Sequence, residues 1–413
     1  MKLKLKTWKS NSYIMFFRIL GRRNIWIKSI KLLFCIGTII IVYEGFISRQ
    51  SSTVPKMKEY DSFFDSLQTE RKSRIADVCQ KEMSKYESLN HASGNFLFYS
   101  SLNLSYCVVA KVGCTFWIAI IRFLLRDFPE NLLKTHPLDI TKYNVHSASK
   151  RLRHLTKDVG YSYLVNSTKF FFARNPYSRL LSGYMDKMML PGYWTSVSVD
   201  IVSLTRNKTN IKCVSDITFR EFLHYAAVSE TKNFHRNGHW IPVYKLCNPC
   251  KWKFDYIGKQ ETFTKDAKVI LEYFGLNYMK NRSHLQNILH QTYSQSEYTF
   301  SFTYAAENIC NQSVEFIARR LWYVYQMQGY IRNTSQFIMP RLKQGEKLTL
   351  VTFQKLVEHE IISNTMTSLE SSNQRKYFWR EFFSKIPTAL IKEIQKVYEL
   401  DFKLFDYSFD SYQ

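Results

Sequence analysis

The stretch YCVVAKVGCTFWIAIIRFLL, residues 106–125, changes within a few residues from a strand pattern to a helix pattern. Apolar side chains precede the change, and residues 116–126 then place apolar side chains near one helical face. The polar and small residues at the join are Lys111, Gly113, Cys114 and Thr115. A short loop from a strand into a helix directs backbone N–H groups and the positive helix end at one point, which predicts an anion site.

A second strand–loop–helix pattern follows at residues 168–188, TKFFFARNPYSRLLSGYMDKM. Arg174 ends its strand and Ser182 lies two helical turns further on, so a guanidinium fork and a hydroxyl can hold a phosphate there. Two such units predict an α/β fold with a central parallel sheet flanked by helices. Because strand ends of a parallel sheet face one crevice, the two loops favour one ligand with two anionic ends.

The first loop also excludes some functions. A nucleoside triphosphate loop has the pattern G-x-x-x-x-G-K-[ST], whereas here Lys111 precedes the only glycine of the loop. Nucleoside triphosphate hydrolysis is therefore not indicated. The chain contains no Asp-x-Asp, which disfavours a metal-dependent glycosyltransferase.

The N-terminal end predicts a membrane anchor. Residues 1–43 hold nine basic residues and no acidic one, and residues 32–43 carry no charge. Extended to residues 25–47, the apolar segment is long enough to span a bilayer, and its basic flank predicts a cytosolic N-terminus. We favour this over a cleaved signal peptide because no small-residue cleavage pattern follows the apolar run. The expected organisation is a cytosolic tail (1–24), a signal-anchor helix (25–47), a stem (48–94) and a lumenal domain (95–413).

Sequons and charge agree with a lumenal body. Six Asn-x-Ser/Thr sequons follow the anchor and predict glycosylation, at Asn103, Asn166, Asn207, Asn281, Asn311 and Asn333. The formal net charge is +24, and removing the nine N-terminal charges leaves +15 on the rest. Such a charge indicates a polyanionic partner. In the lumen that partner is an acidic glycan rather than nucleic acid.

The cysteines predict disulfides rather than a metal site. Seven of the eight cysteines lie past the anchor, as in proteins of an oxidising compartment. His239, Cys247 and Cys250 in HWIPVYKLCNPC suggest zinc, but a structural site needs a fourth ligand and none is evident. We expect disulfides, whose pairing the sequence leaves open, together with a free Cys114 and no metal.

Taken together, AKVGCTFW and FFFARNPYSRLLSGYMDKM resemble the paired nucleotide-binding motifs of Golgi carbohydrate sulfotransferases, in particular the chondroitin 4-O-sulfotransferase and HNK-1 sulfotransferase group. VSDITFREFLHY, HWIPVYKLCNPC, FDYIGKQETFTKDAKVIL and VYELDFKLFDYSFDSYQ resemble this group too. The resemblance covers about 75–280 and 372–413 and leaves about 281–370 as an insertion. It implies a P-loop-like sulfotransferase domain of a single-pass type II Golgi membrane protein.

The resemblance also implies the donor and its site. The donor would be PAPS (3′-phosphoadenylyl sulfate), with no metal. Its phosphosulfate would be held by the first loop, through Lys111, Val112, Gly113, Cys114 and Thr115. Its 3′-phosphate would be held by Arg174 and Ser182. The family usually has an acidic residue after this arginine, where the present chain has Asn175.

The implied reaction is in-line transfer of a sulfuryl group to a sugar hydroxyl, with Lys111 neutralising charge on the leaving phosphate and a general base taking the hydroxyl proton. The first candidate base is His146, which resembles a His-Val-Ser stretch of related enzymes, followed by His239 and then by His154 and Glu261. The implied acceptor is N-acetylgalactosamine, at its 4-position, in chondroitin or dermatan. An HNK-1-like or N-glycan acceptor, an inactive glycan-binding homologue and a homo-oligomer stay open.

Overall fold

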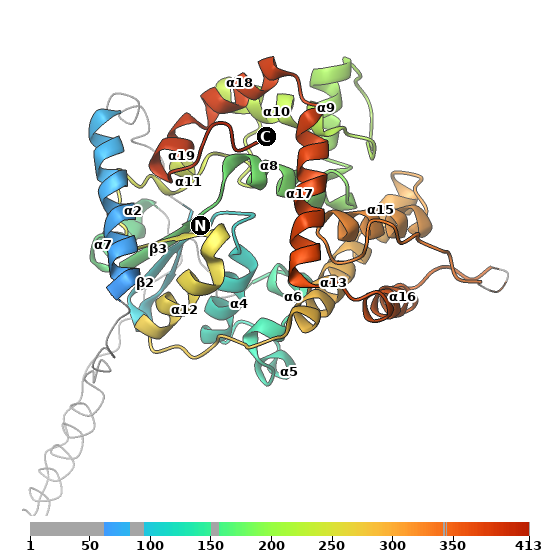
Figure 1. The fold of residues 1–413 in the computed structure, drawn as a ribbon, viewed down its shortest axis with the longest axis horizontal. Helices are drawn as coiled ribbons and strands as arrows, with labels where there is room; N and C mark the ends of the chain where they lie inside the picture. Colours follow the sequence, from blue (N-terminus) through green and yellow to red (C-terminus); the bar gives the residue numbers. More distant parts are fainter. Residues whose placement is uncertain (1–61, 83–94, 150–156, 342, 344, 413) are drawn as a thin grey trace, which may run out of the picture. The chain divides into compact units, whose positions relative to one another are not determined.

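The computed structural model describes residues 62–82, 95–149, 157–341, 343 and 345–412 (Figure 1). The expected anchor, residues 25–47, and His154 lie outside these ranges. Within them, no helix combines the length and the apolar character needed to cross a membrane.

A four-stranded sheet in the order β1-β2-β3-β4 forms the centre of the α/β fold. The strands are β1 (Phe96–Tyr99), β2 (Leu104–Cys107), β3 (Thr168–Ala173) and β4 (Tyr256–Lys259). β2 pairs with β3 and β3 with β4 in parallel, as predicted. The prediction of a parallel sheet is wrong for β1, which pairs antiparallel with β2. Only residues 100–103 join these two strands, too short a connection for the crossover that parallel pairing requires.

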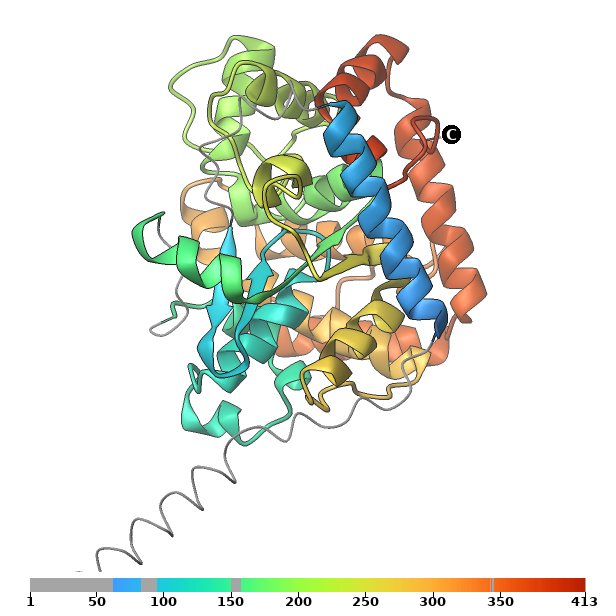
Figure 2. The same ribbon diagram turned by 90° about the vertical axis from the view of Figure 1, so that its left-hand side faces the viewer.

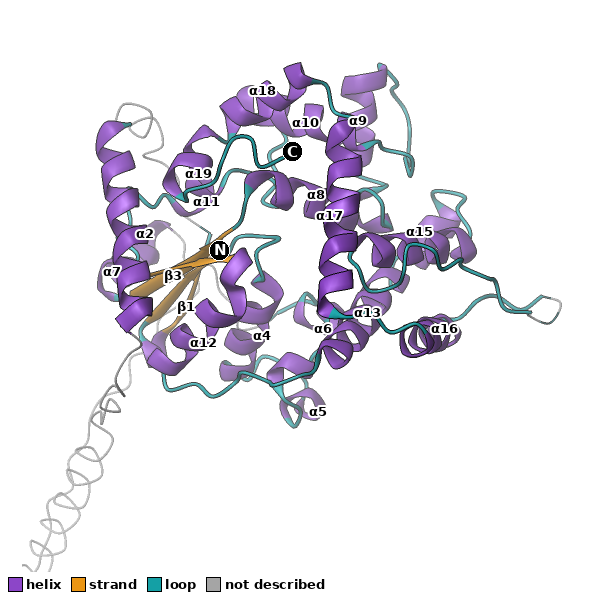
Figure 3. Cartoon of the chain, in the orientation of Figure 1, coloured by secondary structure: helices purple, strands orange, loops and turns teal. Residues whose placement is uncertain are grey.

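Helices surround the sheet and make up most of the described chain (Figure 3). In chain order they are α2 (Ser62–Lys81), α4 (Cys114–Leu124), α5 (Glu130–Leu133), α6 (Lys142–Val145), α7 (Lys157–Asn166), α8 (Pro176–Lys187), α9 (Val197–Arg206), α10 (Phe219–Thr231), α11 (Val243–Cys247), α12 (Phe263–Tyr273), α13 (His284–Phe300), α14 (Thr303–Asn308), α15 (Val314–Met327), α16 (Leu350–Ser363), α17 (Ser368–Ser384), α18 (Thr388–Val397) and α19 (Glu399–Leu404). The two predicted strand–loop–helix units are therefore β2–α4 and β3–α8.

The central strand β3 explains why its sequence is a continuous apolar run. Phe170, Phe171 and Phe172 are all fully buried, so side chains on both faces of the strand are covered. Trp117 of α4 packs on Phe170, with ring centroids 4.5 Å apart. The first strand–loop–helix unit is thereby packed against the second.

Helix α2 lies within the range expected to be stem, and it packs on β4 (Figure 2). Gln68 accepts a hydrogen bond from the Ile257 N–H at 2.9 Å, and Arg71 donates to the Ile257 carbonyl at 2.6 Å. A disulfide joins Cys79, near the end of α2, to Cys250. Helix α2 is thus bonded covalently to the domain that holds the sheet.

The range expected to be an insertion, about 281–370, forms helices α13 to α16. Figure 1 shows α13, α15, α16 and α17 on the side of the domain away from the sheet. Their apolar faces share one buried cluster with α8 and α10, which includes Leu180, Phe222 and Tyr325. This packing brings one face of α13 to the end of α8, where the predicted site lies.

Candidate sulfotransferase site

The two predicted anion loops meet at the carboxyl ends of β2 and β3. Because these strands are parallel neighbours, the loops that follow them lie at one edge of the sheet. Arg174 donates a hydrogen bond from Nη1 to the backbone carbonyl of Lys111 at 3.0 Å. The prediction that the two loops lie together is confirmed.

The glycine of the first loop is required by its surroundings. Gly113 precedes α4 with φ at +84°, and an added Cβ would lie 2.3 Å from the ring of Phe263. Lys111 itself has φ at +70°, in the left-handed region that lysine rarely adopts. Val112 between them is fully buried, so the loop is fixed directly after the lysine.

A cluster of three lysines surrounds one carboxylate beside the first loop; we call Lys111, Lys142, Lys187 and Asp186 the lysine cluster. Asp186 lies one helical turn after Ser182 on α8. Its carboxylate oxygens lie 3.0 Å from Lys111 Nζ, 2.5 Å from Lys142 Nζ and 3.6 Å from Lys187 Nζ. The four charges sum to +2, so the cluster is suited to a further anion.

Burial and the neighbouring charges shift the pKa values of Lys111 and Asp186 in this cluster. Burial lowers the pKa of Lys111 to about 8, and Lys142 and Lys187 act in the same direction while Asp186 opposes them. Burial alone would raise the pKa of Asp186, but the three lysines outweigh it and hold that pKa well below its usual value. At neutral pH Lys111 is charged, and it is closer to losing its proton than an ordinary lysine.

His146 lies beside the first anion loop, as the resemblance implied. Its Nε2 shares a hydrogen bond with Thr115 Oγ1 at 3.0 Å. The protein atoms around the ring desolvate it, and this desolvation, followed by the nearby Lys142 and Lys187, lowers the pKa of His146 to about 4. Part of the residue is nevertheless exposed to solvent. The imidazole is therefore neutral at physiological pH and able to accept a proton.

His239 lies near the same cluster, and one of its ring nitrogens is engaged in hydrogen bonds. Nδ1 is 2.7 Å from Asn237 Oδ1 and 3.0 Å from the Tyr193 hydroxyl. The amide oxygen only accepts, so Nδ1 carries the proton and Nε2 keeps its lone pair. Burial, and then Lys187, lower the pKa of His239 well below its usual value.

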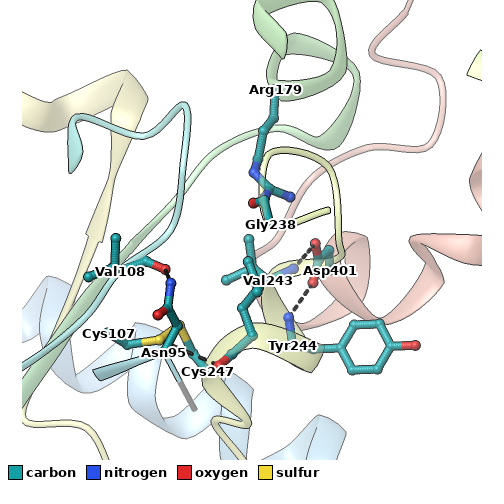
Figure 4. The surroundings of a disulfide bond; sticks show 10 residues. Asn95, Cys107, Val108, Arg179, Gly238, Val243, Tyr244, Cys247 and Asp401 are labelled. Atoms are coloured by element: carbon teal, nitrogen blue, oxygen red, sulfur yellow. Dashed lines mark hydrogen bonds between the residues drawn. A yellow bond between two sulfur atoms is a disulfide. The ribbon is translucent and has the colours of Figure 1, made fainter. Parts of the chain in front are cut away.

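Arg179 of α8 connects the His239 loop to the first anion loop. Its guanidinium donates to the carbonyls of Ala110, Ile241 and Gly238, at 3.0, 2.6 and 3.0 Å. Figure 4 shows Arg179 beside Gly238, above the Cys107–Cys247 disulfide that joins β2 to α11. Arg179 and the disulfide thus connect the loop that carries His239 to the strand and loop that precede Lys111.

Asp401 of α19 supports the same loop from the C-terminal side. Its carboxylate accepts the N–H groups of Val243 and Tyr244, at 2.7 and 2.8 Å, at the start of α11 (Figure 4). The C-terminal stretch that resembles the family therefore contributes to the position of the site.

The second anion loop opens into a cavity of about 840 Å³. Arg174 and Ser182 both line it, as do Arg375, Lys376 and Arg380 of α17. We call this the phosphate cavity. Its cations and its position next to the lysine cluster fit a nucleotide with anionic groups at two ends.

Glu261 is not brought to the lysine cluster. Its carboxylate accepts the Asn175 N–H at 3.0 Å and the Tyr407 hydroxyl at 2.9 Å, so it fixes the second loop to the C-terminal segment. Asn175 in turn caps α8, where it accepts the Ser178 N–H at 3.2 Å. Asparagine at this position keeps the capping role that an acidic residue also performs.

The predictions of disulfides and of a free Cys114 are confirmed for the described residues. The bonded pairs are Cys79–Cys250, Cys107–Cys247 and Cys213–Cys310. Both cysteines of the Cys-x-x-Cys are therefore in disulfides and not available to zinc, and Cys114 is free. In the described ranges no group of three or more His, Cys, Asp or Glu side chains could hold a metal ion. The asparagines of all six sequons are exposed.

Sequence reasoning missed three charged residues of the cluster, Asp186, Lys142 and Lys187. Asp186 lies four residues after Ser182, and Lys142 lies four residues before His146. Each therefore shares a helical face with a residue that was predicted. This spacing is the signal that could have found two of them.

The chain was compared with known proteins. A family model described as "Sulfotransferase family" matches residues 94–330. A carbohydrate sulfotransferase 12 from Mus musculus is 30% identical over 246 residues, which cover 51% of this chain and 57% of that protein. A carbohydrate sulfotransferase 14 from Mus musculus is 33% identical over 173 residues, 41% of this chain and 43% of that protein. A carbohydrate sulfotransferase 9 from Homo sapiens is 29% identical over 221 residues, 51% of this chain and 48% of that protein.

This chain thus spans about half the length of the curated relatives it matches. No solved structure matches it. The family match continues to residue 330, past the start of the expected insertion at about 281. Because it covers more than half of the sequence, and because it includes both anion loops, the chain belongs to the sulfotransferase family.

Proposed function

We propose that this protein transfers the sulfuryl group of PAPS to a hydroxyl of a glycan, and more narrowly to the 4-hydroxyl of N-acetylgalactosamine in chondroitin or dermatan. One observation carries the proposal. The bond from Arg174 to the Lys111 carbonyl joins two anion loops, with the lysine cluster at the first and the phosphate cavity at the second. This pair of sites suits a donor that is anionic at both ends.

The residues present fit that donor. Lys111 and the N–H groups at the start of α4 would hold the phosphosulfate end, while Arg174 and Ser182 would hold the 3′-phosphate in the phosphate cavity. PAPS supplies an activated sulfuryl group. The lysine cluster would stabilise the negative charge that develops on the phosphate side as the group leaves.

The base that takes the hydroxyl proton is His146 in our proposal, with His239 as the second candidate. The contact between His146 and Thr115 supports the first assignment, because Thr115 belongs to the phosphosulfate loop. The proton on Nδ1 of His239 supports the second, because it leaves Nε2 as an acceptor. Both imidazoles are neutral at pH 7, as a base must be.

The acceptor is the least specified part of the proposal. The net charge of +24 supports a polyanionic partner, and the names of the relatives support a carbohydrate acceptor. The experiment combines the protein with radiolabelled PAPS and desulfated chondroitin, dermatan or heparan, followed by disaccharide analysis of the product. Sulfate at the 4-position of N-acetylgalactosamine is expected. Label in heparan alone would overturn the acceptor, and PAPS binding without turnover on a broader glycan panel would indicate an inactive homologue.

We also propose a type II orientation in the Golgi membrane, supported by the nine basic residues ahead of residues 32–43. A C-terminal tag should then be protected from protease in intact microsomes and degraded once detergent is added. Degradation in intact microsomes would contradict this orientation.

A further inference from the structure

Asp186 is an anion inside a site that the proposed function assigns to an anion. Its side chain is 9% exposed, and each charged group paired with it is a lysine. In the part of the chain that the structure describes, Lys111 and Lys142 form ion pairs with Asp186 alone. The Asp186 carboxylate is therefore paired with the same cations that would bind the donor in the proposed function.

The position of Lys111 is fixed by more than this ion pair. Its backbone has φ at +70°, which persists only where the surroundings impose it, and its carbonyl is held by Arg174 at 3.0 Å. The side chain extends from this fixed point to Asp186 at 3.0 Å. An arriving anion would find the ammonium group of Lys111 in place but already paired.

We propose that Asp186 is an internal counter-ion that occupies, in the protein without donor, the place at Lys111 that the phosphosulfate group of the donor takes. Donor binding then exchanges one anion for another at Lys111, while Lys142 and Lys187 continue to neutralise Asp186. The inference rests on the proposed function, because it assigns the phosphosulfate to the first loop.

This exchange has a consequence opposite to that of an ordinary binding residue. Asp186→Asn removes a competitor for Lys111, so an anion should bind more tightly. If the carboxylate only supported the fold or the positions of the lysines, its removal would instead weaken anion binding. The sign of the change in affinity therefore separates the two roles.

The pH of the measurement decides whether that sign is visible. Burial, Lys142 and Lys187 lower the pKa of Lys111 to about 8, and the Asp186 carboxylate opposes them. Without it the pKa of Lys111 falls further, so Asp186→Asn moves the loss of the lysine proton toward neutral pH. The affinities are therefore compared at pH 6, which lies below the pKa of Lys111, so that this lysine is charged.

Other titratable groups face the cluster from neighbouring elements. His146 follows α6, His239 precedes α11, and Tyr193 and Tyr298 lie over Lys187 at 5.2 and 5.3 Å from ring centroid to Nζ. The pKa of His146 is about 4 and that of His239 is well below its usual value, both because of burial first. Burial raises the pKa of Tyr298. The histidines therefore stay neutral between pH 6 and pH 8.

The experiment measures the dissociation constant of adenosine 3′,5′-bisphosphate, the product nucleotide, by calorimetry on the full domain at pH 6 and pH 8. We expect Asp186→Asn to bind it at least tenfold more tightly than wild type at pH 6. The advantage should shrink at pH 8, because the variant loses the Lys111 proton at lower pH. The matched control Asp200→Asn removes an exposed carboxylate on α9 and should leave the affinity unchanged.

A second pair of variants covers the case in which Asp186→Asn alone does not fold. Lys142→Gln/Asp186→Asn keeps the net charge of the cluster, and it should bind the nucleotide more tightly than Lys142→Gln. Equal or weaker binding in the variants that lack the carboxylate, with wild type binding normally, would overturn this inference alone. If wild type itself does not bind the nucleotide, the proposed function fails and the inference fails with it.

Discussion

The lysine cluster and the phosphate cavity are both cationic, but they differ in their exposure to water. In the cluster, the side chains of Lys187 and Asp186 are 6% and 9% exposed. In the cavity, Arg375, Lys376 and Arg380 are exposed, whereas Arg174 is partly buried. Charges removed from water interact strongly, whereas exposed charges are screened. The first region is therefore suited to act on the reacting group, and the second to bind the far end of the donor.

Replacement of the two loop cations is the strongest test of this difference. Lys111→Ala should lower kcat by about a hundredfold or more, since one such electrostatic contact contributes on the order of 3 kcal/mol in the transition state. Arg174→Ala should act chiefly on the dissociation constant of PAPS. Initial rates over a range of PAPS concentrations, with direct binding measurements, distinguish the two effects.

The control for both variants is Lys268→Ala, which removes an exposed cation on α12 that pairs with Glu272 one turn away. It should leave kcat and PAPS affinity unchanged. Near-normal activity in Lys111→Ala or Arg174→Ala would contradict the assignment of that loop.

The two loops were predictable from the sequence because each is a local pattern. A strand, a short polar loop and a helix follow one another in the chain, so periodicity locates Lys111 and Arg174. Parallel pairing of β2 with β3 follows from repetition of that pattern. The disulfides were predictable as a class, but Cys79–Cys250 could not be, because 171 residues separate its partners.

The rest of the site depends on tertiary contacts that no local pattern specifies. Lys142 reaches Asp186 because α6 packs on α13, where the Lys142 N–H donates to Ser294 at 2.7 Å. The α17 cations line the same cavity as Arg174 although about 200 residues separate them in the chain. The antiparallel β1 was also missed, since its direction depends on the length of a short turn and not on strand periodicity.

The two histidines near the lysine cluster provide the next test. His146→Ala should keep PAPS affinity while kcat falls by about a hundredfold or more, the usual contribution of a general base. His239→Ala should have the smaller effect on kcat. Rates at saturating PAPS and acceptor, with thermal unfolding to verify the fold, compare the two. Normal turnover in His146→Ala and a folded but inactive His239→Ala would move the assignment to His239.

The pH dependence of kcat/KM should report the buried lysine. Lys111 has a pKa of about 8 and is charged below it, so kcat/KM should fall by about tenfold per pH unit above pH 8. His146 has a pKa of about 4 and is a base above it, so no loss is expected between pH 7 and pH 5. An ordinary histidine would already be protonated across much of that range.

The matched variant for this profile is Lys111→Arg, whose guanidinium stays charged to higher pH. The alkaline loss should move upward in this variant even if its maximal rate is lower. An alkaline loss at the same pH in wild type and Lys111→Arg would assign that titration to another group.

The exposed cations of α17 should give the smallest effect, and this effect should depend on salt. Arg375→Ala and Arg380→Ala should each weaken binding of adenosine 3′,5′-bisphosphate by about two- to fivefold, because an exposed ion pair contributes roughly 0–1 kcal/mol. Raising the salt concentration should reduce the difference between these variants and wild type, since exposed charges are screened. The loss in Arg174→Ala should change less with salt, because Arg174 is partly buried and is held by its bond to the Lys111 carbonyl. Calorimetric titrations at two salt concentrations measure both quantities. A loss in Arg375→Ala as large and as salt-resistant as that in Arg174→Ala would show that exposure does not separate the two regions.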